Sequence, residues 1–239
     1  MPKLLLDLDK TSICLQGELE CIDQSHTLSL PIKVRLGQQS VEIYIINPVE
    51  LTALIELAYT QYDGVILFTS GDWDNDVRNA LAKALNLSDS VRKQFKACSI
   101  HSAASDAEQL NLEHDKVRDM TKFERLKKIR QIDPTLKDVN FAFLDNDLAH
   151  VTSFKKCPYV EEVLATTYEP EKSFYSETHA ALERCKQQEE LHRNALTDPQ
   201  AHYNDLLSQL RAGFALFEKN KIKVQDKTPV CTEQKGFSA

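Results

Sequence analysis

Three short apolar runs, each followed at once by an acidic or hydroxyl side chain, constrain the fold of this chain more than any other feature. The runs are residues 4–6, 65–68 and 141–144. They are followed by Asp7, Thr69 and Asp145. Short apolar runs bounded by polar residues are typical of buried strands in a parallel sheet. Because the carboxyl ends of parallel strands meet at one edge of the sheet, we expect these polar groups to gather there.

The segments between these runs carry apolar side chains at helical spacing. In residues 48–62, leucine, isoleucine and alanine recur every three or four positions, which predicts a crossover helix. Residues 76–87 and 122–132 are predicted to be helices for the same reason. Alternating strands and helices predict an α/β fold with a three-layer core around a parallel sheet.

Residues 28–46 interrupt this alternation. Apolar and polar residues alternate on both sides of a turn at residues 37–40, which contains a glycine. This pattern predicts a β-hairpin insert after the first strand. We expect residues 13–27, which precede it, to be a connecting loop.

After about residue 170 the sequence predicts polar helices in place of strands. Thr197-Asp198-Pro199 is typical of a helix start. The apolar residues that follow it at helical intervals are Tyr203, Leu206, Leu207, Leu210, Phe214 and Phe217. We therefore expect a main domain over residues 1–170, a helical extension over residues 171–224 and a disordered tail over residues 225–239. The extension is expected to pack on the main domain, and contact with a partner or a membrane is the alternative.

Composition narrows the class of protein. The 239 residues carry a formal net charge of −7, which argues against a nucleic-acid-binding protein. The six cysteines form no C-x-x-C pair, so reduced thiols in the cytoplasm are the expectation. We expect neither a signal peptide nor a transmembrane segment, because no apolar run is long enough. A protein exported by a specialised secretion system into the cytosol of a target cell would have the same composition.

Asp7 and Asp9 form the pair of carboxylates with the most chemical interest. Alternate residues of an extended chain point to the same side, so both carboxylates would enter one crevice. Like charges in a desolvated cleft are costly unless a cation compensates them, and Mg²⁺ prefers such oxygen ligands. One carboxylate can then attack phosphorus while the other transfers a proton to the leaving oxygen. The alternative is a strand followed by a turn, with Thr11 capping the next segment.

The order of these motifs resembles the haloacid dehalogenase (HAD) superfamily of aspartate-based phosphotransferases. Within it, the chain is most similar to the branch of phosphatases that act on the carboxyl-terminal repeats of RNA polymerase II. That branch has D-L-D-x-T on its first strand, a β-hairpin insert, a later F-T-x-S and a later L-D-N. The matching segments here are residues 7–11, 28–46, 68–70 and 144–146. The resemblance spans residues 3 to about 155.

This resemblance implies a phosphatase that works through an aspartyl-phosphate. Asp7 is expected to be the nucleophile and Asp9 the general acid and base. Thr69 is expected to hold the transferring phosphoryl group. Ser70 and Trp73 follow it closely in the chain, so we expect them beside it as substrate contacts. The Trp73 ring motivates the hypothesis that phosphotyrosine is a substrate, although packing is the commoner use of a tryptophan.

The resemblance also implies a Mg²⁺ cofactor. Its expected ligands are the Asp7 side chain, the backbone carbonyl of Asp9 and the side chain of Asn146, with Asp145 beside them. A metal ion and a lysine together would neutralise a highly charged transition state.

Two positions depart from the family pattern. Asn47 stands before Pro48 where the family has arginine, so any contact that this arginine makes is in doubt. The family's lysine could correspond to Lys122, Lys116 or Arg118. We favour Lys122, because a threonine precedes it as in many relatives, and a solvated helix start is the alternative.

The expected function is hydrolysis of phosphomonoesters on phosphoproteins, at phosphotyrosine or at phosphoserine and phosphothreonine. The two insertions are too short for a separate lid domain, and an open site favours a protein substrate. The alternatives are a catalytically silent interaction module with the same fold and a phosphatase of small molecules.

Overall fold

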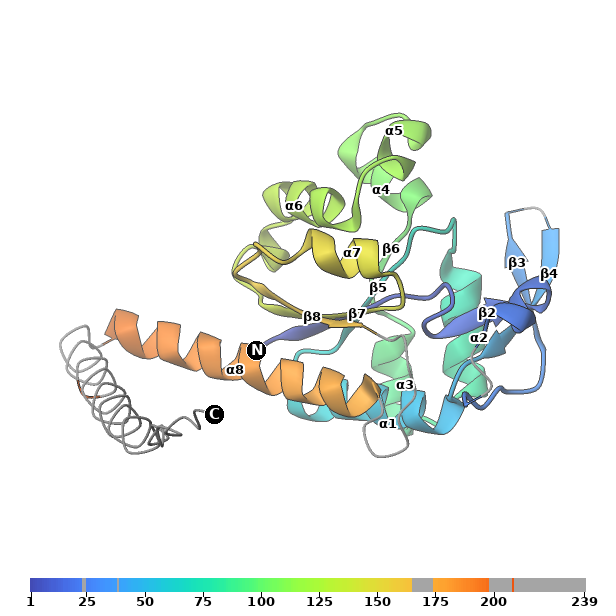
Figure 1. The fold of residues 1–239 in the computed structure, drawn as a ribbon, viewed down its shortest axis with the longest axis horizontal. Helices are drawn as coiled ribbons and strands as arrows, with labels where there is room; N and C mark the ends of the chain where they lie inside the picture. The colour runs from blue at the N-terminus through green and yellow to red at the C-terminus, as the bar shows by residue number, and fades with distance from the viewer. Residues whose placement is uncertain (23–24, 38, 165–173, 198–207, 209–239) are drawn as a thin grey trace, which may run out of the picture. The chain divides into compact units, whose positions relative to one another are not determined.

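A computed structural model describes residues 1–22, 25–37, 39–164, 174–197 and 208 (Figure 1). Met1–Glu189 form one compact unit, which carries all of the features discussed below. The apolar positions of residues 203–217 and the predicted tail lie outside the described residues. The only described helix after residue 170 is α8 (Phe174–Thr197), which ends where a new helix was predicted to start.

The core of this unit is a five-stranded parallel sheet with the strand order β6-β5-β1-β7-β8. Its strands are β1 (Lys3–Leu6), β5 (Val65–Phe68), β6 (Ile100–His101), β7 (Phe141–Asp145) and β8 (Val160–Leu164). The three predicted strands are therefore present as β1, β5 and β7, and the prediction of an α/β fold with a parallel sheet is confirmed. The edge strands β6, of two residues, and β8, of five, were not predicted.

Helices cover both faces of the sheet (Figure 1). Successive residues of a strand point to opposite faces, so Leu5 packs on one side while Leu4 and Leu6 pack on the other. The Leu5 side is covered by α6 (Lys122–Ile132) and α7 (Leu148–Ser153). The opposite side is covered by three helices and by the first part of α8. These three helices are α1 (Pro48–Gln61), α2 (Asn75–Ala84) and α3 (Asp89–Phe95).

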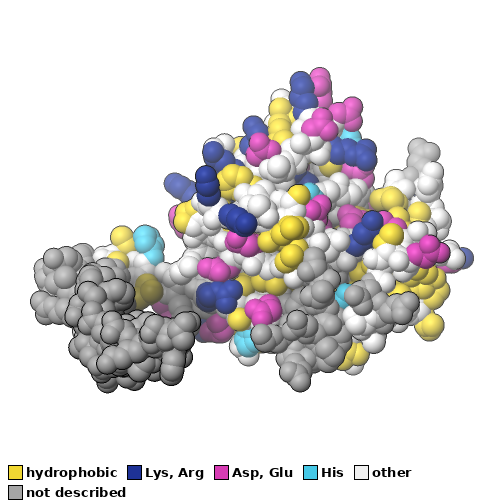
Figure 2. Space-filling model, in the orientation of Figure 1, with side chains coloured by type: hydrophobic (Ala, Val, Ile, Leu, Met, Phe, Trp, Pro, Cys, Tyr) yellow, Lys and Arg dark blue, Asp and Glu magenta, His cyan; other side chains and the backbone are white. Residues whose placement is uncertain are grey.

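The predicted crossover helices are present because their apolar residues lie on one face, and side chains cap the first turns of α2 and α6. The buried residues of α1 are the four apolar positions that gave the helical spacing, Leu51, Leu54, Ile55 and Ala58. At the start of α6, Thr121 and Glu124 cap each other's backbone in a capping box. Two further helices, α4 (Ala103–Leu110) and α5 (His114–Arg118), lie between β6 and α6. Acidic and basic side chains are interspersed over the face that Figure 2 shows.

The hairpin insert is formed by β3 (Ile32–Leu36) and β4 (Gln39–Ile45), with Val34 opposite Val41. The first strand of the hairpin starts after Pro31, which has no N–H to donate. A third strand, β2 (Ile13–Leu15), pairs with β4. The prediction that residues 13–27 form only a connecting loop is therefore wrong. Besides β2, this segment contains a 3₁₀ helix over Gln16–Cys21. A strand of three residues is too short for its period to be recognised.

The strand order places a switch point at β1. From β1 the chain builds β5 and β6 on one side, and later β7 and β8 on the other side. Crevices that bind ligands lie at the carboxyl ends of the strands at such a point. Among the described residues, no helix combines the length and apolar character needed to cross a lipid bilayer.

Asn47, which stands directly before Pro48 at the start of α1, has a local structural role. Its backbone is in the left-handed region, with φ 47° and ψ 59°, and only 3% of the residue is exposed. Its side-chain oxygen accepts a hydrogen bond from the Thr27 N–H at 2.8 Å, and its amide nitrogen lies 2.8 Å from Nδ1 of His26. Asparagine tolerates this conformation better than longer side chains do, so it can join the start of α1 to the insert.

Two substitutions at Asn47 separate backbone strain from hydrogen bonding. We expect Asn47→Gly to destabilise the protein by about 1–2 kcal/mol through the lost hydrogen bonds. Asn47→Ala should cost about 1 kcal/mol more, because alanine also strains the left-handed backbone. Urea unfolding of both variants measures this difference. Equal stability of the two variants would show that the backbone conformation carries no cost.

Candidate active site

The loop after β1 brings two carboxylates to the same side of the sheet edge. Asp7 continues the strand, and its N–H donates to the carbonyl of Leu144 at 3.0 Å. Leu8 points into the core, so Asp9 returns to the side of Asp7. The chain then reverses at Lys10, whose φ is 58°, and three successive N–H groups from residues 11–13 approach the Leu8 carbonyl at 2.9–3.3 Å.

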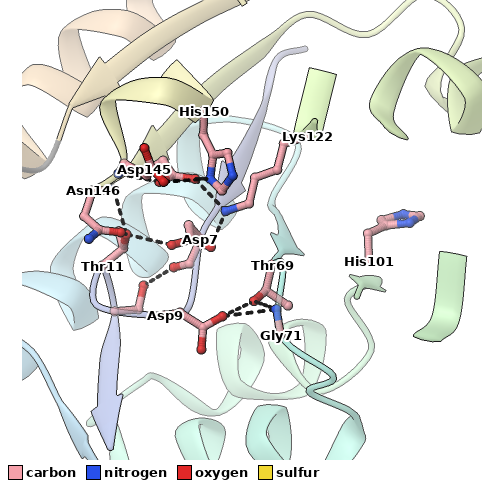
Figure 3. Close-up of polar contacts among 12 residues, drawn as sticks. Asp7, Asp9, Thr11, Thr69, Gly71, His101, Lys122, Asp145, Asn146 and His150 are labelled. Carbon is pink, nitrogen blue, oxygen red and sulfur yellow. Dashed lines mark hydrogen bonds and ion pairs between the residues drawn. The ribbon is translucent and has the colours of Figure 1, made fainter. Parts of the chain in front are cut away.

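Asp7 is held from two directions (Figure 3). The Thr11 hydroxyl donates to Oδ2 at 2.8 Å, and the Lys122 ammonium donates to Oδ1 at 2.5 Å. The Ser12 hydroxyl donates to the Asp7 carbonyl at 2.6 Å. Asp7 is only 2% exposed, so each of its oxygens depends on these protein donors.

Lys122 is the cation of this site. It is the first residue of α6, is 2% exposed, and also donates to Oδ2 of Asp145 at 2.5 Å. In contrast, the Lys116 side chain is 64% exposed and pairs with Glu113, and Arg118 is exposed as well. Lys122, and not Lys116 or Arg118, is therefore the basic residue that contacts the buried carboxylates Asp7 and Asp145.

Asn146 lies beside Asp7 because both contact Thr11. The Asn146 N–H donates to the Thr11 hydroxyl at 2.9 Å, and the Asn146 Oδ1 lies 3.2 Å from the same oxygen. Since the hydroxyl has one proton, it can donate to either Asp7 or Asn146 at one time. The carboxyl ends of β1 and β7 therefore meet in one polar cluster, as the strand pattern predicted.

Asp9 belongs to a second set of contacts with the loop after β5. The Thr69 hydroxyl donates to Asp9 Oδ2 at 2.6 Å, and the Gly71 N–H donates to the same oxygen at 3.2 Å. The Trp73 indole N–H donates to Oδ1 at 2.7 Å. Trp73 is 3% exposed, which leaves little of its ring to contact a substrate, whereas Ser70 is exposed.

Three carboxylates share the site with one lysine. Burial raises the pKa of Asp7, Lys122 lowers it, and the charges of Asp145 and Asp9 raise it again, giving a pKa of about 7. For Asp145, burial is outweighed by His150, Lys122 and neighbouring donors, so its pKa lies below the ordinary value. For Lys122, burial opposes the charge, but Asp7 and Asp145 raise its pKa above the ordinary value. The cluster therefore has more negative than positive charge.

A buried network that the sequence analysis did not identify supports Thr69. Arg125 lies one turn after Lys122 on α6, and its guanidinium donates to the Thr69 carbonyl at 2.9 Å. Its Nε and Nη2 donate to Asp106 at 2.9 and 2.5 Å, and Asp106 also lies 2.8 Å from Nδ1 of His101. The spacing of Lys122 and Arg125 on one helix face was the available signal.

His150 is a second residue that the sequence analysis missed. It lies on α7, and its Nδ1 is 3.3 Å from Oδ2 of Asp145 (Figure 3). No local pattern indicated it, because its place depends on how α7 packs over β7.

The oxygen atoms of this site fit a hard divalent cation in part. The side chains of Asp7 and Asn146 converge on one hydroxyl, and two buried carboxylates share the single Lys122 ammonium, an imbalance that a divalent cation would offset. In the described ranges, no three side chains of the His, Cys, Asp and Glu types are grouped to hold a metal. Asp9 points its carboxylate to Thr69 and Trp73, so only its backbone carbonyl would remain for a metal.

Comparisons with known proteins found no match to a family model, to a curated protein or to a solved structure.

Removal of the central cation tests the electrostatics of the site. We expect Lys122→Met to lower the free energy of unfolding by about 3–5 kcal/mol, because two buried carboxylates lose their partner. Lys116→Met is the matched control on the exposed pair and should change stability by less than about 0.5 kcal/mol. Urea unfolding at pH 8 measures both, and a similar small effect of the two substitutions would contradict the role of Lys122.

The raised pKa of Asp7 gives a pH dependence of defined sign. Its carboxyl group has a pKa of about 7 in the folded protein and 3.8 as the ordinary value, so the folded state binds this proton more tightly. The stabilising contribution is complete below about pH 4 and is lost as the pH rises to about 7, by up to about 4 kcal/mol. With a chelator present, the stability of the natural protein relative to Asp7→Asn should therefore fall over this range. A constant difference from pH 4 to pH 8 would contradict it.

Proposed function

We propose that this protein is a magnesium-dependent phosphatase of the HAD type, which hydrolyses phosphomonoesters through an aspartyl-phosphate. The observation that carries the proposal is the double contact of Asp7 with Thr11 and Lys122 at the carboxyl edge of the sheet. Asp9 lies two residues further on and is held by Thr69. A nucleophile, a proton donor, a hydroxyl and a cation at one edge form the set that phosphoryl transfer needs.

In the first step, a carboxylate oxygen of Asp7 forms a bond to phosphorus while the bond from phosphorus to the leaving oxygen breaks. Asp9 donates its proton to that leaving oxygen. In the second step, Asp9 takes a proton from water as the water oxygen attacks phosphorus, which returns the Asp7 carboxylate and releases phosphate. In this proposal the Thr69 hydroxyl turns from Asp9 to donate to a phosphoryl oxygen, and Lys122 offsets the negative charge on Asp7 throughout.

The residues that would hold Mg²⁺ are Asp7, the backbone carbonyl of Asp9 and Asn146, with Asp145 beside them. When bound, the ion would supply positive charge to the phosphoryl oxygens. Asp145 is engaged by Lys122 and by the Asp147 N–H, so its part is to orient Lys122 at the edge of that set.

A phosphorylated protein is the substrate class that we favour. At this edge of the sheet Ser70 is exposed, and Asp9 and Asn146 are half-buried. This exposure supports approach by a phosphorylated side chain on another protein. A silent interaction module and a phosphatase of small molecules are the outcomes against which the proposal is tested.

A phosphopeptide panel tests the proposal. We expect phosphate release in Mg²⁺ that stops with a chelator. Asp7→Asn should abolish turnover, and Asp9→Asn should lower kcat by about 10²–10⁴-fold, because it removes the general acid. Asp115→Asn, an exposed acid on α5, is the control and should retain full activity.

The outcomes separate the alternatives. Full magnesium-dependent activity of Asp7→Asn would overturn the assignment of the nucleophile. Binding of Mg²⁺ without turnover of any phosphoester would favour the silent module. Turnover of phosphometabolites in preference to all phosphopeptides would favour the small-molecule phosphatase.

A further inference from the structure

Trp73 makes a contact that its role in packing does not require. It is the single tryptophan of the chain, and its indole N–H donates to Oδ1 of Asp9 at 2.7 Å. We propose that Trp73 is a positioning residue, which fixes the carboxylate of Asp9 for proton transfer. This inference rests on the proposed function, in which Asp9 is the general acid and base.

The donors around Asp9 are not equivalent during the reaction. Oδ2 receives the Thr69 hydroxyl at 2.6 Å and the Gly71 N–H at 3.2 Å. The Thr69 hydroxyl has one proton, so it must leave Asp9 when it donates to a phosphoryl oxygen. The Gly71 N–H is shared with the Thr69 oxygen at 3.1 Å. The Trp73 N–H is therefore the unshared donor that stays on Asp9 in both states.

The surroundings of Trp73 make this donor rigid. Its ring is buried in the core cluster on the α1 and α2 side of the sheet. A ring fixed by packing loses little conformational entropy when it holds a hydrogen bond, unlike a long flexible side chain. Through this hydrogen bond, the packed core fixes the orientation of the Asp9 carboxylate.

Because Gly71 has no side chain, it leaves room for the hydrogen bond between Trp73 and Asp9. A Cβ atom at position 71 would lie 2.8 Å from Nε1 of Trp73 and 2.9 Å from Oδ2 of Asp9. Any side chain there would push the indole and the carboxylate apart. The turn after Thr69 is thus built for the approach of these two groups.

Leaving-group dependence separates positioning from simple packing. A general acid matters most for a poor leaving group, such as the serine oxygen of a phosphopeptide, and least for p-nitrophenolate. Trp73→Phe keeps an aromatic ring and removes the N–H. Phe95→Leu removes a similar part of a fully buried ring in the same cluster and has no hydrogen bond to Asp9.

We expect Trp73→Phe to lower kcat/KM for a phosphoserine peptide at least about tenfold more than kcat/KM for p-nitrophenyl phosphate, because kcat/KM reports the step in which the leaving oxygen departs. Phe95→Leu should change both kcat/KM values by the same factor. An equal factor for both substrates in Trp73→Phe would overturn the positioning role while the proposed function stands.

The contact itself can be observed without turnover. The single indole N–H gives one signal in a ¹H–¹⁵N correlation spectrum of ¹⁵N-labelled protein. Asp9→Ala should move this signal upfield and speed its exchange with solvent, because the charged acceptor is lost. An unmoved signal would overturn the inference. If the natural protein hydrolyses neither substrate, the proposed function fails, and the signal still decides whether Trp73 holds Asp9.

Discussion

The paired contacts of Lys122 with Asp7 and Asp145 are the interaction on which the rest of the site depends. They place one ammonium group 2.5 Å from two carboxylates at the ends of adjacent strands, and all three groups are buried. Desolvation of such charges costs about as much as their attraction returns, so apolar side chains would serve packing at least as well. This balance supports the proposed chemistry, because the fold does not need these buried charges for its stability.

Helix α6 joins the two halves of the polar edge. Lys122 in its first turn contacts the acids of β1 and β7, and Arg125 one turn later holds the Thr69 carbonyl after β5. The Arg125 guanidinium also lies 5.0 Å from the centre of the Phe68 ring, so it is fixed by packing as well as by hydrogen bonds. The start of α6, set by the Thr121 cap, therefore fixes the spacing of both contacts.

Local pattern was sufficient for the central strands, for α1 and α6, and for the residues that follow β1, β5 and β7. It failed for β6, which has two residues, and for β8, where Glu161 and Glu162 interrupt the apolar run of an edge strand. The choice of Lys122 came from the family resemblance and not from local pattern, which also could not give the contacts of Trp73 or Arg125. Those contacts join segments 19 to 64 positions apart, and their geometry arises only when the helices pack.

The alternation along β1 has a consequence for how this gene could vary. Leu4 and Leu6 face one layer, Leu5 faces the other, and the same parity carries Asp7 to the edge and Leu8 back into the core. Adding or deleting one codon within this stretch would exchange the two sides and turn a carboxylate toward hydrocarbon. Residues of this strand can be substituted one by one, whereas an insertion or deletion of one residue would disrupt the central strand of the sheet.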